Sequence, residues 1–527
     1  MLEKYYNWVQ NNDSSFPGFL LCENFNYTGK EDVTMKKIII VGAGIAGLTA
    51  GIYARKSGFD VTIYESHTIP GGASTSWRRK GYLFEGGMHW LIGSSPKTPL
   101  NKLWREVGAL DNTTDIINRD PFVTAEYNGQ RACLYRDIER LRKHFMELSP
   151  EDEKMTNSLC RDLKRFSNIN MPVMDIKGVK AQEKSSMKFS AILKMLPAIP
   201  RMSFYANQSV KEYASRFKSP IIRLLLENIV GSEYSATGMI FTIATLVSGD
   251  GGYPAGGSLA MANRMAKYFG KIGGNIIYGN KVGKVIVENG IAKGVIINEQ
   301  EILADAVIVT LDTRVAIDTM FEAPIAEPWA EDMRKNTKPL INTFISIGVE
   351  ADLSDLPERF EFGLDEPIMC GNIAETGIRI CNYAGYKGYA PEGSTSITSP
   401  ILSDTYDFWK SCKENGTYAE EKEKLAKAFI YVLARKFPQT AGKVAVWDVA
   451  TPLTYERYLG SYKGSWMSVM NKGDRGTSYP SMPQSIKNVY FAGQRLQSPG
   501  GLPVALDTGR KAVQYLCRDT DTVFKNN

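Results

Sequence analysis

Three glycines, Gly42, Gly44 and Gly47, have the spacing G-x-G-x-x-G. They follow the β-branched run 38–41, which is typical of a strand buried on both faces of a parallel sheet. In such a motif the first glycine makes a tight turn, the second lets the backbone approach a pyrophosphate, and the third allows close packing of helix on strand. The N-terminus of the helix that follows offers unpaired N–H groups to phosphate. The spacing therefore predicts a dinucleotide site.

An acidic residue, Glu65, ends the next predicted strand, 60–64. A carboxylate about 20 residues after the glycine motif is placed to accept hydrogen bonds from the adenosine ribose, and it favours a free 2′-hydroxyl over a 2′-phosphate. Strand, glycines, helix, strand and terminal acid occur in order. This order favours a binding site over a glycine-rich turn that binds nothing.

A second glycine-rich stretch distinguishes between two dinucleotides. Residues 71–74 read Gly-Gly-Ala-Ser, and the run 81–90 adds a glycine pair followed by Met88 and His89. An NAD dehydrogenase has no need of a second such loop directly after the ribose acid. FAD continues past the pyrophosphate into a ribityl chain and a flavin, and it does need more small-residue backbone. The two stretches therefore favour FAD.

These segments resemble the FAD-dependent phytoene desaturase and amine oxidase superfamily. The run from Glu65 to His89 looks most like its carotenoid isomerase and retinol saturase branch, and Ala73 stands where many carotenoid desaturases have arginine. The resemblance implies an α/β fold, in which a Rossmann-like FAD-binding domain of the GR2 type carries an inserted α+β substrate or lid domain.

Two later blocks extend the resemblance. The turn Asn289-Gly290 predicts a hairpin over 282–297, because both residues tolerate positive φ; in the family the residue matching Val282 meets the adenine. The block 488–503 leads into a helix whose N-terminus, in the family, points at the flavin pyrimidine and stabilises negative charge there. Gln494 replaces the acid that most members have.

The glycine motif and the resemblance together implicate one set of residues in cofactor binding: Gly42, Ala43, Gly44, Ile45, Ala46, Gly47, Glu65, Gly71, Gly72, Ala73, Ser74, Gly87, Met88, His89, Val282, Gly493, Gln494, Gly501, Leu502 and Pro503. His89 is also the single candidate for a catalytic residue. The alternative is that His89 orders the FAD loop through a hydrogen bond.

The blocks also predict a domain division. Residues 35–110, 250–315 and 480–527 form a discontinuous FAD-binding domain, and residues 111–249 and 316–479 form the substrate or lid domain. Residues 1–34 are an N-terminal extension, and Met35 is a candidate for the true start.

Composition excludes several classes of protein. A chain of 527 residues with 43% hydrophobic residues and a net charge of +6 is neither disordered nor fibrous. Seven cysteines without a C-x-x-C pair and three scattered histidines predict a reduced, cytoplasmic protein without a metal site. The longest uncharged run, 38–54, is short for a membrane span. The basic residues are dispersed, so nucleic-acid binding has no support.

Residues 186–202 mix basic and apolar side chains. That composition suits peripheral contact with an anionic membrane beside the entrance for a lipid. A surface helix that caps the core is the alternative.

The resulting functional hypothesis is an FAD-dependent oxidoreductase that desaturates, saturates or isomerises carbon–carbon double bonds of an apolar polyene, isoprenoid or related lipid. NAD(P)H as a transient donor, a quinone, oxygen or a protein are candidate redox partners. The first alternative is a flavin amine or amino-acid oxidase. The second is a non-catalytic prenyl-lipid carrier of the GDP-dissociation-inhibitor type.

Overall fold

The computed structural model describes residues 35–186, 193, 195–474 and 476–527. The chain divides into two units, Met1–Met35 and Lys36–Asn527, and the description that follows concerns the second. The proposed N-terminal extension, 1–34, lies outside the described residues.

A parallel sheet of five strands carries the glycine motif. Its order is β21 (Val489–Phe491), β13 (Ala306–Val309), β1 (Lys37–Val41), β2 (Asp60–Tyr64) and β9 (Asn275–Ile277), and every pairing is parallel. β1 lies in the middle, and its side chains from Ile38 to Val41 are buried. The continuous β-branched run therefore forms the doubly covered strand that the sequence predicts.

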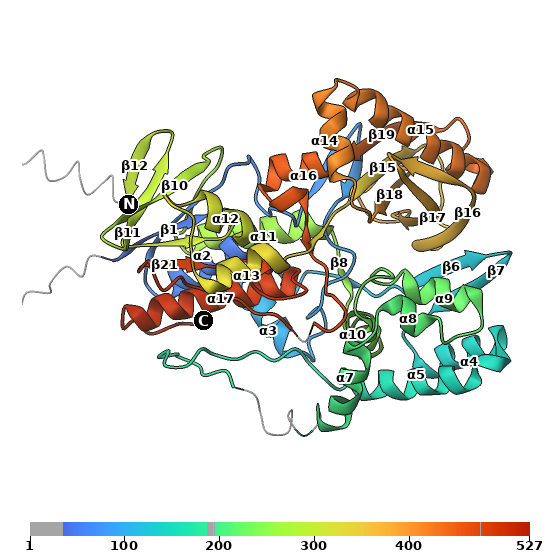
Figure 1. Ribbon diagram of the computed structural model, residues 1–527, viewed down its shortest axis with the longest axis horizontal. Helices are drawn as coiled ribbons and strands as arrows, with labels where there is room; N and C mark the ends of the chain where they lie inside the picture. Colours follow the sequence, from blue (N-terminus) through green and yellow to red (C-terminus); the bar gives the residue numbers. More distant parts are fainter. Residues whose placement is uncertain (1–34, 187–192, 194, 475) are drawn as a thin grey trace, which may run out of the picture. The chain divides into compact units, whose positions relative to one another are not determined.

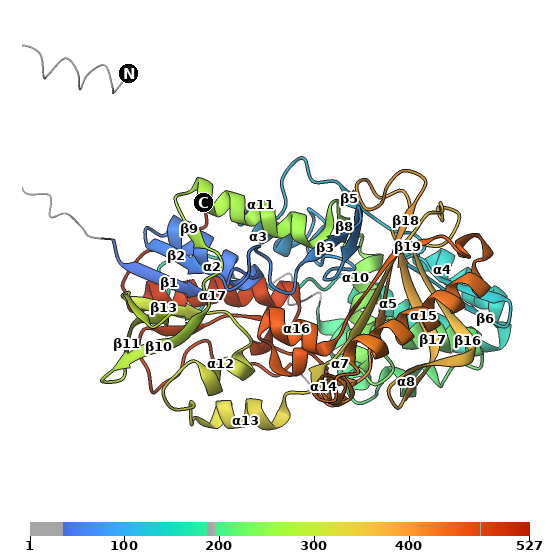
Figure 2. The ribbon, with the colours of Figure 1, turned by 90° about the horizontal axis from the view of Figure 1, so that it is seen from above.

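Three helices pack around this sheet. Helix α2 (Ile45–Lys56) lies between α11 (Gly257–Lys271) and the C-terminal helix α17 (Leu502–Asp519), as Figure 2 shows. The crossing of α2 and α17 is close, because a Cβ added at Gly509 would lie 2.6 Å from the carbonyl oxygen of Ala46. This contact fixes the N-terminus of α17 relative to the N-terminus of α2.

A three-stranded antiparallel sheet, β10 (Val282–Glu288), β11 (Ile291–Ile297) and β12 (Gln300–Leu303), extends from the same region. Asn289 and Gly290 both have positive φ, 49° and 73°, which confirms the predicted hairpin turn. Together with the parallel sheet, this arrangement confirms the predicted Rossmann-like α/β fold class.

A seven-stranded sheet has the order β19 (Val444–Ala450), β15 (Thr343–Val349), β18 (Thr395–Ile401), β17 (Ile373–Asn382), β16 (Arg359–Cys370), β6 (Val123–Tyr127) and β7 (Gln130–Leu134). Helices α14 (Tyr406–Glu414) and α15 (Tyr418–Lys436) cover one face (Figure 1). There Phe360 and Phe362 of β16 pack with Phe429 and Leu433 of α15. The opposite face of β16 and β17 borders a cavity.

Six helices form another hydrophobic cluster beside β6 and β7: α4 (Ile138–Leu148), α5 (Glu153–Phe166), α7 (Ile199–Ala206), α8 (Val210–Ala214), α9 (Pro220–Glu227) and α10 (Ala236–Val247). The remaining elements include β3 (Ser76–Arg79), β4 (Tyr82–Glu85), α3 (Pro99–Glu106), β5 (Ile116–Ile117), β8 (Tyr253–Pro254), α12 (Thr313–Thr319), α13 (Pro328–Asn336), β14 (Pro339–Leu340), α16 (Pro452–Leu459) and β20 (Met467–Ser468). The division of these elements into an FAD-binding domain and a substrate domain stays a proposal.

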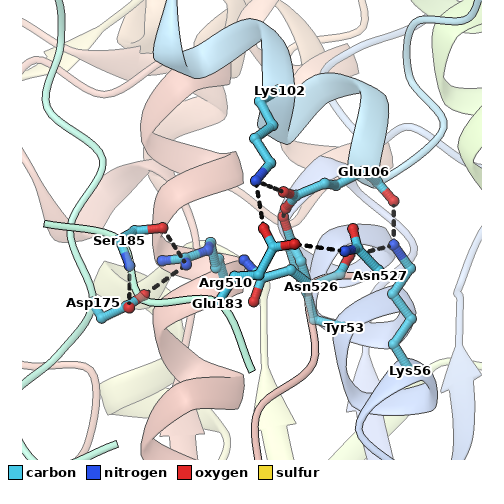
Figure 3. A network of polar contacts seen from close by, with 10 residues as sticks. All are labelled: Tyr53, Lys56, Lys102, Glu106, Asp175, Glu183, Ser185, Arg510, Asn526 and Asn527. Atoms are coloured by element: carbon cyan, nitrogen blue, oxygen red, sulfur yellow. Dashed lines mark hydrogen bonds and ion pairs between the residues drawn. The ribbon is translucent and has the colours of Figure 1, made fainter. Parts of the chain in front are cut away.

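A polar network ties the C-terminal end of the chain to α2 and α3 (Figure 3). Lys56 donates to the backbone carbonyls of Glu106, at 2.7 Å, and Asn526, at 2.8 Å. Within α17 the fully buried Arg510 donates to Asp175 at 2.6 Å. These bonds hold α17 along α2, with both N-termini on the cavity.

In the described ranges, no helix combines the length and apolar character that a membrane crossing requires. None of the cysteines in the same ranges forms a disulfide.

Candidate cofactor and substrate site

One cavity of about 1590 Å³ runs from the glycine motif to the inner face of β16 and β17. A pocket for one small molecule occupies roughly 300–1,000 Å³. The cavity is therefore large enough for a cofactor and a substrate together, and most of its wall is apolar.

The three glycines of the motif have different roles. Gly42 follows β1 and has φ +101°, and a Cβ added at Gly47 would lie 1.9 Å from the carbonyl oxygen of Gly42, so the fold itself requires both. Gly44 has φ −68°, which any residue adopts, and no protein atom lies closer than 3.9 Å to its added Cβ. Gly44 lines the cavity, so the space beside it is open to a ligand.

The N-terminus of α2 fits a pyrophosphate. Gly44 is its N-cap residue, no side chain caps the first turn, and Ile45 and Ala46 line the cavity. The first-turn N–H groups of a helix have no partner within the helix, and they favour an anion. We propose that this turn holds the pyrophosphate of FAD.

Glu65 lies buried at the end of β2 and also lines the cavity. Its carboxylate accepts hydrogen bonds from the backbone N–H of Ala43 at 2.7 Å and of His67 at 2.8 Å. The oxygen bonded to His67 also accepts from the hydroxyl of Ser66 at 3.2 Å, whereas the oxygen bonded to Ala43 can accept a second bond, so capacity remains for a ribose hydroxyl. Val282 at the start of β10 lines the same end of the cavity.

A buried carboxylate organises the loop before His89. Glu85 accepts from the N–H groups of Gly87 at 3.0 Å and Met88 at 3.1 Å with one oxygen, and from that of Ser258 at 2.9 Å with the other. The hydroxyl of Ser258 in turn accepts from Met88 at 2.8 Å. Burial raises the pKa of Glu85. The roles of Glu85 and Ser258 were not predicted from the sequence, although an acid within an apolar strand was a signal, since burying it requires partners.

The third segment of the site is the loop that leads into α17. Gly501, with φ +85°, is the N-cap, and no side chain caps this helix either. Gln494 accepts from the N–H of Gly501 at 3.1 Å and donates to the carbonyl of Trp466. The side-chain amide of Gln494, which replaces the acid of most family members, therefore holds this loop in place.

A buried ion pair, unrecognised in the sequence, anchors the same loop. Arg495 donates to both carboxylate oxygens of Asp312, at 3.0 and 2.7 Å, and to the hydroxyls of Ser465 and Ser468. Asp312 also accepts from the N–H of Tyr462 at 3.0 Å. The pair connects the end of β13 to the loop before α17.

His89 lies in the cavity wall, with its Nδ1 3.5 Å from the sulfur of Cys381. Burial, with a smaller effect of Arg359 and Arg119, lowers the pKa of His89 to about 3. An imidazole with this pKa is neutral near pH 7 and is a weak base. We therefore propose that His89 positions the loop and does not transfer a proton.

The substrate end of the cavity is bordered by one face of α10 and the residues just before it. Tyr234, Gly238, Phe241 and Thr245 recur at the helical spacing and all line the cavity. Thr237 and Thr242 of the same helix line the cavity too, and the apolar side chains of Met202 and Met470 lie in the same wall.

All but two of the predicted cofactor residues line the cavity. The exceptions are Ala43, whose N–H is bonded to Glu65, and Gly47, which packs on Gly42. Both residues stabilise the glycine turn through contacts within the protein, and neither borders the cavity. The assignment of the others to FAD stays a proposal.

Fold and cavity together are typical of one class of protein, an oxidoreductase built around a dinucleotide cofactor. Residues 45–517 match the family described as flavin containing amine oxidoreductase. The chain belongs to this family and is a flavin-dependent oxidoreductase, as the sequence predicts.

Named relatives agree with the predicted resemblance to carotenoid desaturases and isomerases. The chain is 20% identical over 504 residues to a 4,4′-diapophytoene desaturase (4,4′-diapolycopene-forming) of Methylomonas sp, which covers 93% of this chain and 97% of that one. It is 24% identical over 478 residues to a chloroplastic prolycopene isomerase of Daucus carota, and the match covers 86% of this chain and 75% of the isomerase. Wild-type putrescine oxidase bound to putrescine superimposes with a TM-score of 0.59 at 15% identity, over 92% and 99% of the two chains, a likeness of fold alone.

Proposed function

We propose that this protein uses FAD to desaturate, saturate or isomerise carbon–carbon double bonds of an apolar polyene, isoprenoid or related lipid. The observation that carries the proposal is the continuous cavity. At one end it is lined by Gly42, Gly44, Gly71 and Gly72, which we call the glycine cradle, and most of the rest of its wall is apolar. Relatives named as a desaturase and an isomerase of carotenoid-type compounds support the same chemistry.

The chain's own residues bind and orient the reactants. Gly44 and the first turn of α2 bind the pyrophosphate, and Glu65 holds the ribose. When bound, FAD supplies the acceptance and donation of hydride. The N-terminus of α17 brings the positive end of its dipole to the cavity, where it stabilises negative charge. The apolar side formed by α10 excludes water and aligns an extended chain.

Amine oxidation is the alternative, and the cavity disfavours it. Arg359 and Arg379 line its inner end, and their positive charges repel an ammonium substrate. The segment 494–501 also has no aromatic residue to build a cage around an amine. A non-catalytic lipid carrier would have no need of the glycine cradle.

Anaerobic flavin spectroscopy tests this function. We expect purified protein to be yellow, to release FAD on denaturation, and to change a polyene such as phytoene or prolycopene into a product with shifted absorption. Because the arginines repel cations, putrescine and cyclohexylamine should leave the flavin spectrum unchanged. Bleaching by an amine, with polyenes left intact, would favour the oxidase instead.

For the redox partner we propose NAD(P)H as a transient electron donor, with a quinone, oxygen or a protein as alternatives. Bleaching of the flavin by anaerobic NAD(P)H would support this donor. A flavin that NAD(P)H leaves unchanged would point to one of the others.

We further propose that the cytoplasmic protein touches membranes through residues 186–202, of which 187–192 and 194 lie outside the described residues. Leu193, Leu196 and Ile199 are 50, 51 and 52% exposed, whereas Met195 and Met202 of the same segment line the cavity. An apolar surface beside the cavity suits the transfer of a lipid from a bilayer.

Replacing two of these side chains should separate the protein from membranes. We expect Leu196→Asp/Ile199→Asp to reduce co-sedimentation with phosphatidylcholine–phosphatidylserine vesicles several-fold while FAD content stays unchanged, because charged side chains do not enter the acyl region. Leu303→Asp, at an exposed position on β12, is the matched control. If the unchanged protein and both variants sedimented equally with vesicles, the membrane contact would be ruled out, and the segment would be a surface helix that caps the core.

A further inference from the structure

The inner face of the seven-stranded sheet presents polar side chains to the cavity. Arg359 and Glu361 on β16 alternate with phenylalanines that pack on the other face. Arg379 and Cys381 lie opposite them on β17, in the pairs Glu361–Arg379 and Arg359–Cys381. All four line the cavity. We call these four residues the polar wall.

Arg359 has no anionic partner in the described protein. Its side chain forms no ion pair there, and its buried Nη1 has no hydrogen-bond partner among the described residues. The guanidinium lies 4.8 Å from the ring centre of Phe122 and 5.8 Å from that of Trp90. Burying a charge without a counter-ion is costly, so this guanidinium favours an anion in the cavity.

The second cation of the polar wall is also uncompensated. Arg379 donates through Nε and Nη2 to the side-chain oxygen of Asn228, at 3.0 and 2.6 Å. An amide orients the guanidinium without neutralising it. Arg119, by contrast, is bonded to Glu358 at 2.7 Å, and its charge is already matched.

Glu361 does not neutralise the two arginines by direct contact. It is 2% exposed, and neither of its carboxylate oxygens has a hydrogen-bond partner among the described residues. Burial raises its pKa to about 7, although Arg379, Arg359 and the nearby side chain of Asn228 act in the opposite direction. Cys381, whose thiol pKa is raised by burial, and the neutral His89 add no charge. The polar wall is therefore positive whether or not Glu361 is ionised.

We propose that the polar wall binds a carboxylate at one end of the substrate, so that the substrate is an apolar chain that ends in an acid. The inference rests on the proposed function, because it assumes that the cavity holds an extended apolar chain beside the flavin. The guanidinium groups of Arg359 and Arg379 offer charge-assisted hydrogen bonds to the carboxylate. The face of α10 contacts the rest of the chain.

A pair of fluorescent probes tests the assignment in the FAD-loaded protein. Parinaric acid and its methyl ester share one conjugated chain and differ only in the charged end. We expect the acid to bind at least about tenfold more tightly, because only the acid forms charge-assisted bonds. Arg359→Met and Arg379→Met should each remove most of this preference and leave both the ester affinity and the flavin spectrum unchanged.

Two controls make the outcomes distinct. Arg131→Met, at an exposed position on β7, should change neither affinity. Equal affinities for acid and ester in the unchanged protein, or acid binding that neither wall variant weakens, would overturn the carboxylate site while leaving the proposed function standing. If neither probe bound to the FAD-loaded protein, the proposed function would fail as well.

The same probes give a readout in pH that does not depend on removing an arginine. Glu361 is influenced by Arg359, Arg379 and Cys381 on the sheet and by Asn228 from another segment. His89 lines the same cavity. Protonated Glu361 can donate to the ligand, whereas its ionised form repels the ligand, so acid affinity should fall as pH rises from about 6 to about 8. Glu361→Gln should abolish this dependence and give tight acid binding throughout. A pH profile that survives this substitution contradicts the proposal.

Discussion

Gly44→Val should give a folded protein that has lost its FAD. No protein atom lies within 3.9 Å of a Cβ at this position, and the backbone φ of −68° suits any residue. The added Cβ makes only ordinary contacts, 3.9 Å to the carbonyl oxygen of Gly71 and 4.0 Å to the Cα of Gly72, and the position lines the cavity in which we place the pyrophosphate. We expect a colourless protein with an unchanged far-ultraviolet circular dichroism spectrum, and FAD affinity reduced by at least about a hundredfold, since close backbone approach is lost.

Substitutions at two other glycines serve as controls for FAD binding and for folding. Gly270, in the last turn of α11, has no atom near its added Cβ, and Gly270→Val should keep stoichiometric FAD. Gly47→Ala should damage the fold itself, because its Cβ would overlap the carbonyl of Gly42. A yellow Gly44→Val protein with a full complement of FAD would show that the nucleotide lies elsewhere.

Local sequence was sufficient to predict the cofactor end of the molecule. β1, the glycine turn, α2, β2 and Glu65 follow one another within about 30 residues, and a βαβ unit of this length fixes its own geometry. The Asn289-Gly290 turn is equally local. The same locality limited the site prediction. Ala43 and Gly47 belong to the motif and were therefore predicted to bind the cofactor. In the structure they do not line the cavity, because Ala43 is bonded to Glu65 and Gly47 packs on Gly42.

Long-range contacts were not predictable in this way. The hydrogen bond between Ser258 and Glu85 and the ion pair between Arg495 and Asp312 join residues more than a hundred positions apart. No sequence motif indicates either contact. The polar wall was missed for a different reason. Arg359 and Glu361 alternate with Phe360 and Phe362, a pattern typical of a strand with one face in water. The sequence alone could not tell that the polar face borders an internal cavity.

Arg495→Met should strongly destabilise the protein near the site. The guanidinium and the carboxylate of Asp312 are 2 and 5% exposed, and removal of one partner leaves the other as an uncompensated buried charge. Such a loss costs about 3–5 kcal/mol. We expect a lowered thermal midpoint in differential scanning calorimetry and weaker FAD retention, because the pair anchors the loop between β21 and α17.

A second substitution distinguishes a lost charge balance from lost packing. In Asp312→Asn/Arg495→Met the asparagine keeps a side-chain oxygen for the N–H of Arg314, but it carries no charge. If the penalty is electrostatic, the double variant should be more stable than Arg495→Met alone. Arg142→Met, which breaks an exposed pair with Glu139, should cost no more than about 1 kcal/mol. A double variant no more stable than the single one would contradict the electrostatic explanation of the penalty.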